Sequence, residues 1–114
     1  MALRIALACL ALLAAAPAEA RPLFRGWWVV LASYPLEPWE RQAQDAARVA
    51  TKARACGATT FNDFSAKFKG FEPGVNVFVV SGAFATRRQA ERKLATMRPC
   101  FPEAYVKKGW HLGE

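Results

Sequence analysis

Two apolar segments with the same pattern of side chains dominate the chain. Residues 28–34 (WVVLASY) and residues 78–84 (FVVSGAF) each begin with an aromatic residue and continue with Val-Val. Each then ends in small residues and a second aromatic one. A short apolar run rich in β-branched and aromatic residues is typical of a buried strand. The pattern therefore predicts two strands of one kind, written twice along the chain.

Helical spacing of small apolar residues follows the first of these strands. We predict a helix from Trp39 to Ala55, because Pro38 suits a helix start and Gly57 suits the position just past a helix end. The buried stripe expected for this helix consists of Ala43, Ala46, Ala47, Ala50 and Ala53, continued by Cys56.

A second helix follows the second strand and begins at a sharper boundary. Thr86 and Gln89 have the spacing of a capping box, in which each side chain bonds the backbone of the other residue. Ala90, Leu94 and Met97 form the expected buried stripe, and Pro99 ends the helix next to Cys100.

A further extended segment follows each helix, at residues 58–68 and 103–109, and the Gly- and Pro-containing residues 69–76 separate the two halves. The order β-α-β, β-α-β predicts an α+β fold of the split βαβ type (βαββαβ, ferredoxin/RNP-like). It would have a four-stranded antiparallel sheet with both helices on one face. In this plan the two repeated strands lie side by side, and the helices end near each other.

The first twenty residues have the pattern of an export leader. Arg4 precedes an apolar segment of 12 residues, Ile5 to Ala16, and Ala18-Glu19-Ala20 fits a cleavage site. An uncleaved anchor is disfavoured because 12 residues are too few to span a bilayer as a helix. We therefore expect a cleaved signal peptide at residues 1–20, one exported domain at residues 21–114, in the periplasm or secreted, and no membrane span after cleavage.

Two cysteines remain after the expected cleavage, Cys56 and Cys100. An even pair in an oxidising compartment favours one disulfide, which in the chain-entropy model contributes about 4 kcal/mol to stability. A redox role is disfavoured because the chain has no C-x-x-C pair and no basic cluster beside either thiol.

The formal net charge of +7 is unchanged by cleavage, because the leader carries one Arg and one Glu. Outside the cytoplasm such a charge suits an anionic wall polymer, membrane headgroups or an acidic partner rather than nucleic acid, or it serves solubility alone. The single His111 has no partner at motif spacing, and no Cys/His cluster or phosphate loop is present. We expect no catalysis, no cofactor and no metal.

The repeated strand pattern resembles the sporulation-related repeat (SPOR) domain family, whose first strand ends near VQxGSF and third near VxxGPF. Residues 29–34 (VVLASY) and 79–84 (VVSGAF) stand at these places, and Ala104-Tyr105-Val106 is similar to the family's last strand. The resemblance covers residues 27–109. It implies a non-catalytic cell-envelope module that binds peptidoglycan glycan strands on an open sheet face. The family's polar sheet positions are Val30 and Val80 here, whereas Ser33 is kept.

Strand alternation predicts which side chains would occupy that face. With Val29, Val77 and Val79 toward the helices, the open face would carry an apolar patch, typical of a binding surface. The predicted ligand-binding residues are Trp28, Val30, Ser33, Phe78, Val80 and Lys107, with Lys67, Lys69 and Lys108 as further cations. Three interpretations stay open: the face holds glycan, forms a protein–protein or homodimer interface, or is covered by residues 21–27 and 110–114.

Overall fold

The computed structural model describes residues 23–113, so the predicted signal peptide at residues 1–20 lies outside the described residues. The strands are β1 (Arg25–Pro35), β2 (Thr60–Phe64), β3 (Phe68–Lys69), β4 (Val75–Val80) and β5 (Tyr105–His111). The helices are α2 (Gln42–Ala55) and α3 (Arg87–Met97), with short 3-10 turns η1 (Trp39–Arg41) and η2 (Ser65–Lys67). The predicted α+β class is confirmed.

The strands form one antiparallel sheet in the order β2-β4-β1-β5-β3. The two repeated strands, β1 and β4, are neighbours as predicted, with Val30 opposite Val79 and Ser33 opposite Val77. A register shift between Val30 and Ala32 bulges β1. A bulge increases the local twist and bends the strand, which favours a curved sheet.

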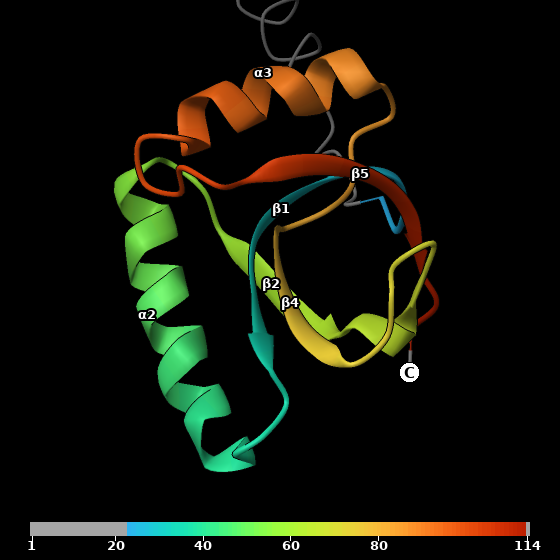
Figure 1. The fold of residues 1–114 in the computed structure, drawn as a ribbon. Coiled ribbons are helices and arrows are strands. Elements are labelled where there is room, and N and C mark those ends of the chain that lie inside the picture. Colours follow the sequence, from blue (N-terminus) through green and yellow to red (C-terminus); the bar gives the residue numbers. More distant parts are fainter. Residues whose placement is uncertain (1–22, 114) are drawn as a thin grey trace, which may run out of the picture.

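The sheet has five strands rather than the predicted four, and it is curled rather than open. The fifth strand is β3, whose two residues are too few for a sequence pattern to mark. The turn η2 connects β2 directly to β3, although these strands lie at opposite edges of the sheet. This short connection draws the edges together, and Figure 1 shows β5 bending round toward the segment that follows β2.

Both helices pack on the convex side of the curl. Their buried residues share one hydrophobic cluster with alternate residues of the central strands. The members that meet there are Val29 and Leu31 of β1, Val49 and Ala53 of α2, Phe78 and Val80 of β4, and Ala90 and Met97 of α3. This burial stabilises the helices, which are too short to be stable alone.

The helix boundaries were predicted well, and the buried stripe of α2 was predicted only in part. In α3 the capping box is present, since Gln89 N donates to Thr86 Oγ1 and Thr86 N donates to Gln89 Oε1. In α2, Ala53 of the predicted stripe is buried and Ala46 and Cys56 pack against the core, but Ala43 and Ala47 are exposed. The buried positions of α2 are Asp45, Val49 and Ala53. The helix is rotated from the predicted stripe because the larger Val49 side chain gains more from burial than an alanine.

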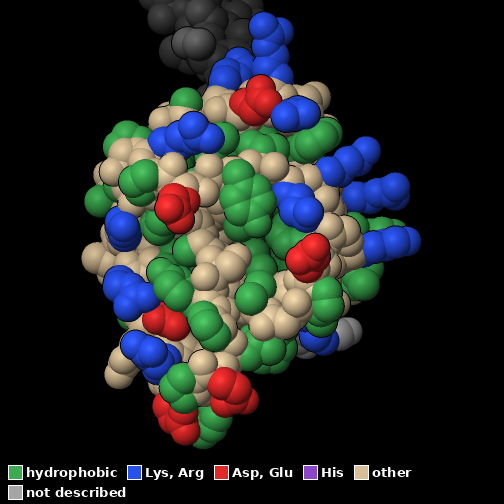
Figure 2. All heavy atoms as spheres, in the orientation of Figure 1, with side chains coloured by type: hydrophobic (Ala, Val, Ile, Leu, Met, Phe, Trp, Pro, Cys, Tyr) green, Lys and Arg blue, Asp and Glu red, His purple; other side chains and the backbone are tan. Residues whose placement is uncertain are grey.

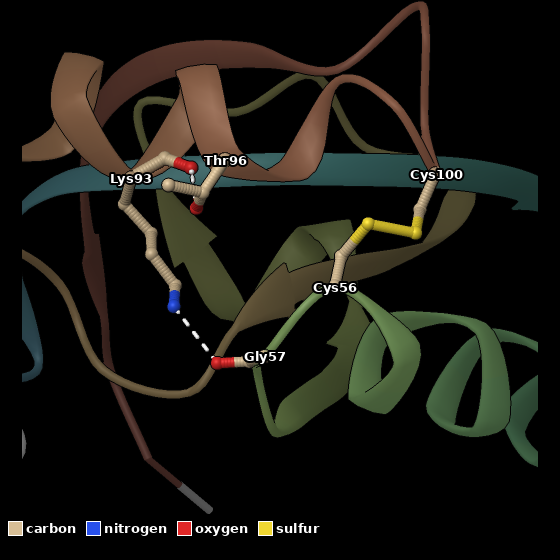
Figure 3. Close-up of a disulfide and its surroundings, with 5 residues drawn as sticks. All are labelled: Cys56, Gly57, Lys93, Thr96 and Cys100. Atoms are coloured by element: carbon tan, nitrogen blue, oxygen red, sulfur yellow. Dashed lines mark hydrogen bonds between the residues drawn. A yellow bond between two sulfur atoms is a disulfide. The ribbon is translucent and has the colours of Figure 1, made fainter.

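The ends of the two helices are joined covalently. Cys56 and Cys100 form a disulfide, with 6.2 Å between their Cα atoms. Figure 3 shows this bond linking the end of α2 to the segment that follows α3. The pairing predicted from the two cysteines is therefore present, and it fixes both helices over the same face of the sheet.

Candidate functional site

The sheet face predicted to be open is the concave interior of the curl. Trp28 and Val30 are each 1% exposed, and they form a second hydrophobic cluster with Phe68, Val77 and Val79. Side chains buried to this degree do not form an open sheet face on which a glycan strand could lie. Trp28 and Val30 therefore serve as core residues in this structure.

The facing predicted for β4 is wrong. Phe78 and Val80 lie on the convex side under the helices, whereas Val77 and Val79 lie in the concave interior. Residues directly opposite each other on neighbouring antiparallel strands share a face. Because Val79 lies opposite Val30, it takes the concave face and sends Phe78 to the other one. The sequence alignment of the two repeated segments does not show which residues of β1 and β4 lie opposite each other, so it could not predict this facing.

The concave interior is covered by aromatic side chains from the middle of the chain. Phe61, Phe68 and Phe71 fill it, and the rings of Trp28 and Phe68 meet edge to face with 5.3 Å between centroids. Trp28 Nε1 also donates to the Gly109 carbonyl oxygen at 3.0 Å. Of the interpretations left open by the sequence, internal cover is the one observed, although most of the cover comes from residues 61–71 rather than from the flanks.

His111, for which the sequence shows no partner at motif spacing, is a buried residue with a partner from β2. It is 7% exposed, and its Nε2 lies 2.8 Å from Asp63 Oδ2. Its ring also packs against the rings of Phe61 and Phe68. The residue therefore belongs to the closure of the curl.

Ser33 and Lys107, the remaining predicted ligand residues, lie apart. Ser33 is exposed near the end of β1, opposite Val77. Lys107 Nζ lies 5.8 Å from the centre of the Phe71 ring, on the concave side of β5. The structure does not bring the six predicted residues together on one accessible surface.

A different surface combines two tryptophan rings with cations; Trp110 is exposed and Trp27 is half-buried. It lies on the convex side of β1, β5 and β3, next to the start of α3, and we call it the cationic tryptophan strip. Its members are Arg25, Trp27, Lys69, Arg87, Lys108 and Trp110. Strand pairing builds it directly, because Arg25 lies opposite Trp110, Trp27 opposite Lys108, and Lys69 opposite Trp110.

Each indole ring of the strip lies between two cations. Arg25 Cζ is 5.1 Å and Lys69 Nζ is 6.0 Å from the centre of the Trp110 ring. Arg87 Cζ is 5.5 Å and Lys108 Nζ is 5.8 Å from the centre of the Trp27 ring. These separations suit cation–π attraction, which holds the long side chains over the rings.

The strip is open to solvent and carries a positive charge. Trp110 is 41% exposed, and a hollow of about 280 Å³ lies beside it between Arg25 and Lys108. Within residues 23–113, Glu91 pairs with Arg87 at 2.9 Å, and neither Arg25, Lys69 nor Lys108 forms an ion pair. Figure 2 shows Lys and Arg side chains projecting together from the side of the molecule along which β5 runs.

Sequence reasoning missed this strip because it treated Trp27 and Trp110 as candidate covers for the other face. The alternation of side chains along β5 could have indicated which of its residues share the strip's side of the sheet. Val106 faces the helices, so Lys108 and Trp110 share the convex side with it. The pairing of these residues with Arg25 and Trp27 depends on strand register, which the local pattern does not specify.

Comparison with protein-family models, with curated proteins and with solved structures gives no match. Among residues 23–113, no three His, Cys, Asp or Glu side chains are grouped so that they could hold a metal ion. None of the helices in the same part of the chain is both long enough and apolar enough to cross a membrane.

Proposed function

We propose that the protein is a non-catalytic binding module of the cell envelope, of the SPOR-like split βαβ type, and that it holds peptidoglycan glycan strands on the cationic tryptophan strip. The single observation that carries this proposal is the exposed Trp110 ring between Arg25 and Lys69. Flat aromatic rings provide apolar contact area with a polar edge, which suits the face of a sugar ring. The cations beside the ring attract carboxylates carried by the glycan.

This assignment moves the glycan site from the concave face to the convex one. The concave side chains Trp28 and Val30 are buried, so they form no open sheet face for a glycan strand or for a flat protein interface. The rival interpretation, a homodimer or protein interface on the same apolar sheet face, loses its surface for the same reason. The resemblance of residues 27–109 to SPOR domains supports the ligand class, and the leader pattern of residues 1–20 supports export to the compartment where that ligand occurs.

The test is co-sedimentation of the protein with isolated peptidoglycan sacculi, intact and treated with an amidase that strips the stem peptides. Retention should rise after the treatment, and Trp110→Ala should lower it about fivefold because a ring and its two cation contacts are lost. Trp39→Ala is the matched control, since Trp39 is 67% exposed and lies outside the strip.

Two results oppose the proposal. Equal losses from Trp110→Ala and Trp39→Ala would mean that any exposed indole contributes, so the strip is not the site. Absence of retention by the folded, oxidised protein would remove the glycan as ligand. Trp110→Phe keeps an aromatic ring at this position. Its retention should therefore lie between that of Trp110→Ala and that of the wild type.

A further inference from the structure

Helix α3 has two flanks with different surroundings. Its buried stripe is Ala90, Leu94 and Met97. Because successive helical residues are rotated by about 100°, Arg87 and Glu91 lie to one side of this stripe, and Gln89 and Lys93 lie to the other. The first flank borders the cationic tryptophan strip. The second flank lines a groove, which we call the α3 groove.

The α3 groove is a surface hollow of about 700 Å³. It runs between the second flank of α3, the loop at residues 81–85 and the side chain of Leu23. Its loop side contributes Ala83, Phe84 and Ala85, which are apolar, and its helix side contributes Arg92 and Lys93. It shares no residue with the strip.

The positive charge of the groove continues past Lys93. A second hollow of about 360 Å³ is lined by Lys93 together with Arg54 and Gly57. Lys93 Nζ donates to the Gly57 carbonyl oxygen at 3.0 Å, and Figure 3 shows this side chain extending from α3 toward Gly57 beside the disulfide. The linings of the two hollows contain three cationic side chains and neither Asp nor Glu.

An apolar slot adjoins the groove. It has a volume of about 190 Å³ and is lined by Phe24, Trp28 and Phe61. It shares Leu23, Ser81 and Gly82 with the groove, so the two hollows are contiguous. The surface therefore combines cations along one part with an adjoining apolar recess.

We propose that the α3 groove docks an acidic segment of a partner protein, with one large apolar side chain of that segment in the slot. Charge complementarity with Arg54, Arg92 and Lys93 requires carboxylates, and the slot requires an apolar anchor of the kind that dominates peptide affinity. A wall polymer has no such anchor. Because the groove and the strip lie on opposite flanks of α3, the protein can hold a wall glycan and a protein segment at once.

The experiment measures fluorescence anisotropy of labelled synthetic peptides with the full chain expressed with its leader. The probe is a peptide of Glu residues around one Phe, compared with the same peptide carrying Ala for Phe and with one carrying Lys for Glu. Arg92→Glu should weaken binding of the first peptide about tenfold, since it exchanges an attraction for a repulsion. Arg54→Glu, at the far end of the surface, should act in the same direction.

Arg88→Glu is the matched control, because it makes the same charge change on the same helix outside the groove lining. It should change the affinity less than twofold. Phe24→Ala should weaken binding of the Phe peptide and leave the Ala peptide unchanged. Phe24 is 61% exposed, so this variant retains the core.

Three results would overturn the proposal: no binding of the Glu/Phe peptide, equal losses from Arg92→Glu and Arg88→Glu, or tighter binding to phosphatidylglycerol vesicles than to the peptide. The last result would assign the cations to a membrane surface. Retention on sacculi is measured on the same variants. Arg92→Glu should leave it unchanged, which keeps the groove and the glycan proposal separately testable.

Discussion

His111 Nε2 lies 2.8 Å from Asp63 Oδ2 and thereby joins β5 to β2, two strands that are separated by β4 and β1 in the sheet. The imidazole is buried between the rings of Phe61 and Phe68, whose centroids are 4.8 and 4.9 Å away. A contact between non-neighbouring strands exists only because the sheet curls. The pair therefore holds the two ends of the curl together around the concave core.

Removal of the carboxylate should destabilise the protein. In Asp63→Ala the buried His111 loses its partner at Nε2, and its Nδ1 has no hydrogen-bond partner among the described residues. An unsatisfied buried polar group costs about 1–3 kcal/mol, so we expect the free energy of unfolding in urea to fall by that amount. Glu72→Ala removes an exposed carboxylate and should change it by less than about 0.5 kcal/mol. Equal effects of the two variants would show that the pair does not stabilise the curl.

Trp28→Ala should act on stability rather than on ligand binding alone. The side chain is 1% exposed, donates to Gly109 and packs on Phe68. Replacing a buried Trp with Ala costs about 3–5 kcal/mol through lost burial and a cavity. Thermal unfolding followed by circular dichroism measures the loss. A variant with unchanged stability and lower sacculus retention would instead place Trp28 at the glycan site.

Gly109 should not tolerate a side chain. A Cβ at this position would lie 2.5 Å from Cε1 of Phe71. Gly109→Ala therefore displaces the Phe71 ring, and overpacking of this kind costs about 1–3 kcal/mol. The double variant Gly109→Ala, Phe71→Leu tests the cause by changing the shape of the displaced side chain. It should be more stable than the sum of the two single effects predicts, whereas simple additivity would contradict a direct clash.

Loss of the disulfide should lower stability substantially. The bond joins residues that are 44 positions apart in the sequence. In the chain-entropy model, closure of such a loop contributes about 4 kcal/mol. The double variant Cys56→Ser, Cys100→Ser should show this loss in urea. Addition of a thiol reductant should reduce the stability of the wild type to the same level and leave the double variant unchanged. A reductant effect on the double variant would point to another cause.

Binding through the cationic tryptophan strip should depend on salt. Charges on an exposed surface are screened within about 10 Å at 0.1 M salt and about 3 Å at 1 M. Retention on stripped sacculi should therefore fall as salt rises between these concentrations. Lys108→Glu should weaken retention at low salt and flatten the salt dependence. Lys52→Glu is the control, because Lys52 lies over the Phe101 ring and outside the strip. It should leave the retention at low salt and its salt dependence unchanged.

Much of the fold follows from local patterns. The helix predicted over residues 39–55 is present as a 3-10 turn at 39–41 followed by α2 to Ala55, and the Thr86–Gln89 capping box and the two strands with Val-Val are also present. The pairing of Cys56 with Cys100 agrees with the adjacency of the repeated strands. The helices, the cap and the strands depend on residues close in sequence. The disulfide could be predicted because the split βαβ order brings the two helix ends, and so the two cysteines, together.

Register, curl and site depend on contacts between distant residues. Whether Phe78 or Val79 faces the helices is decided by which residue lies opposite Val30, and a shift by one position exchanges the faces. A two-residue strand and a single His–Asp pair turn an expected open sheet into a closed one, and neither leaves a periodic pattern. Composition and periodicity were sufficient for an α+β domain with an internal repeat and a positive charge. Only the packed chain placed Trp110 between its cations, because cross-strand neighbours are set by the sheet as a whole.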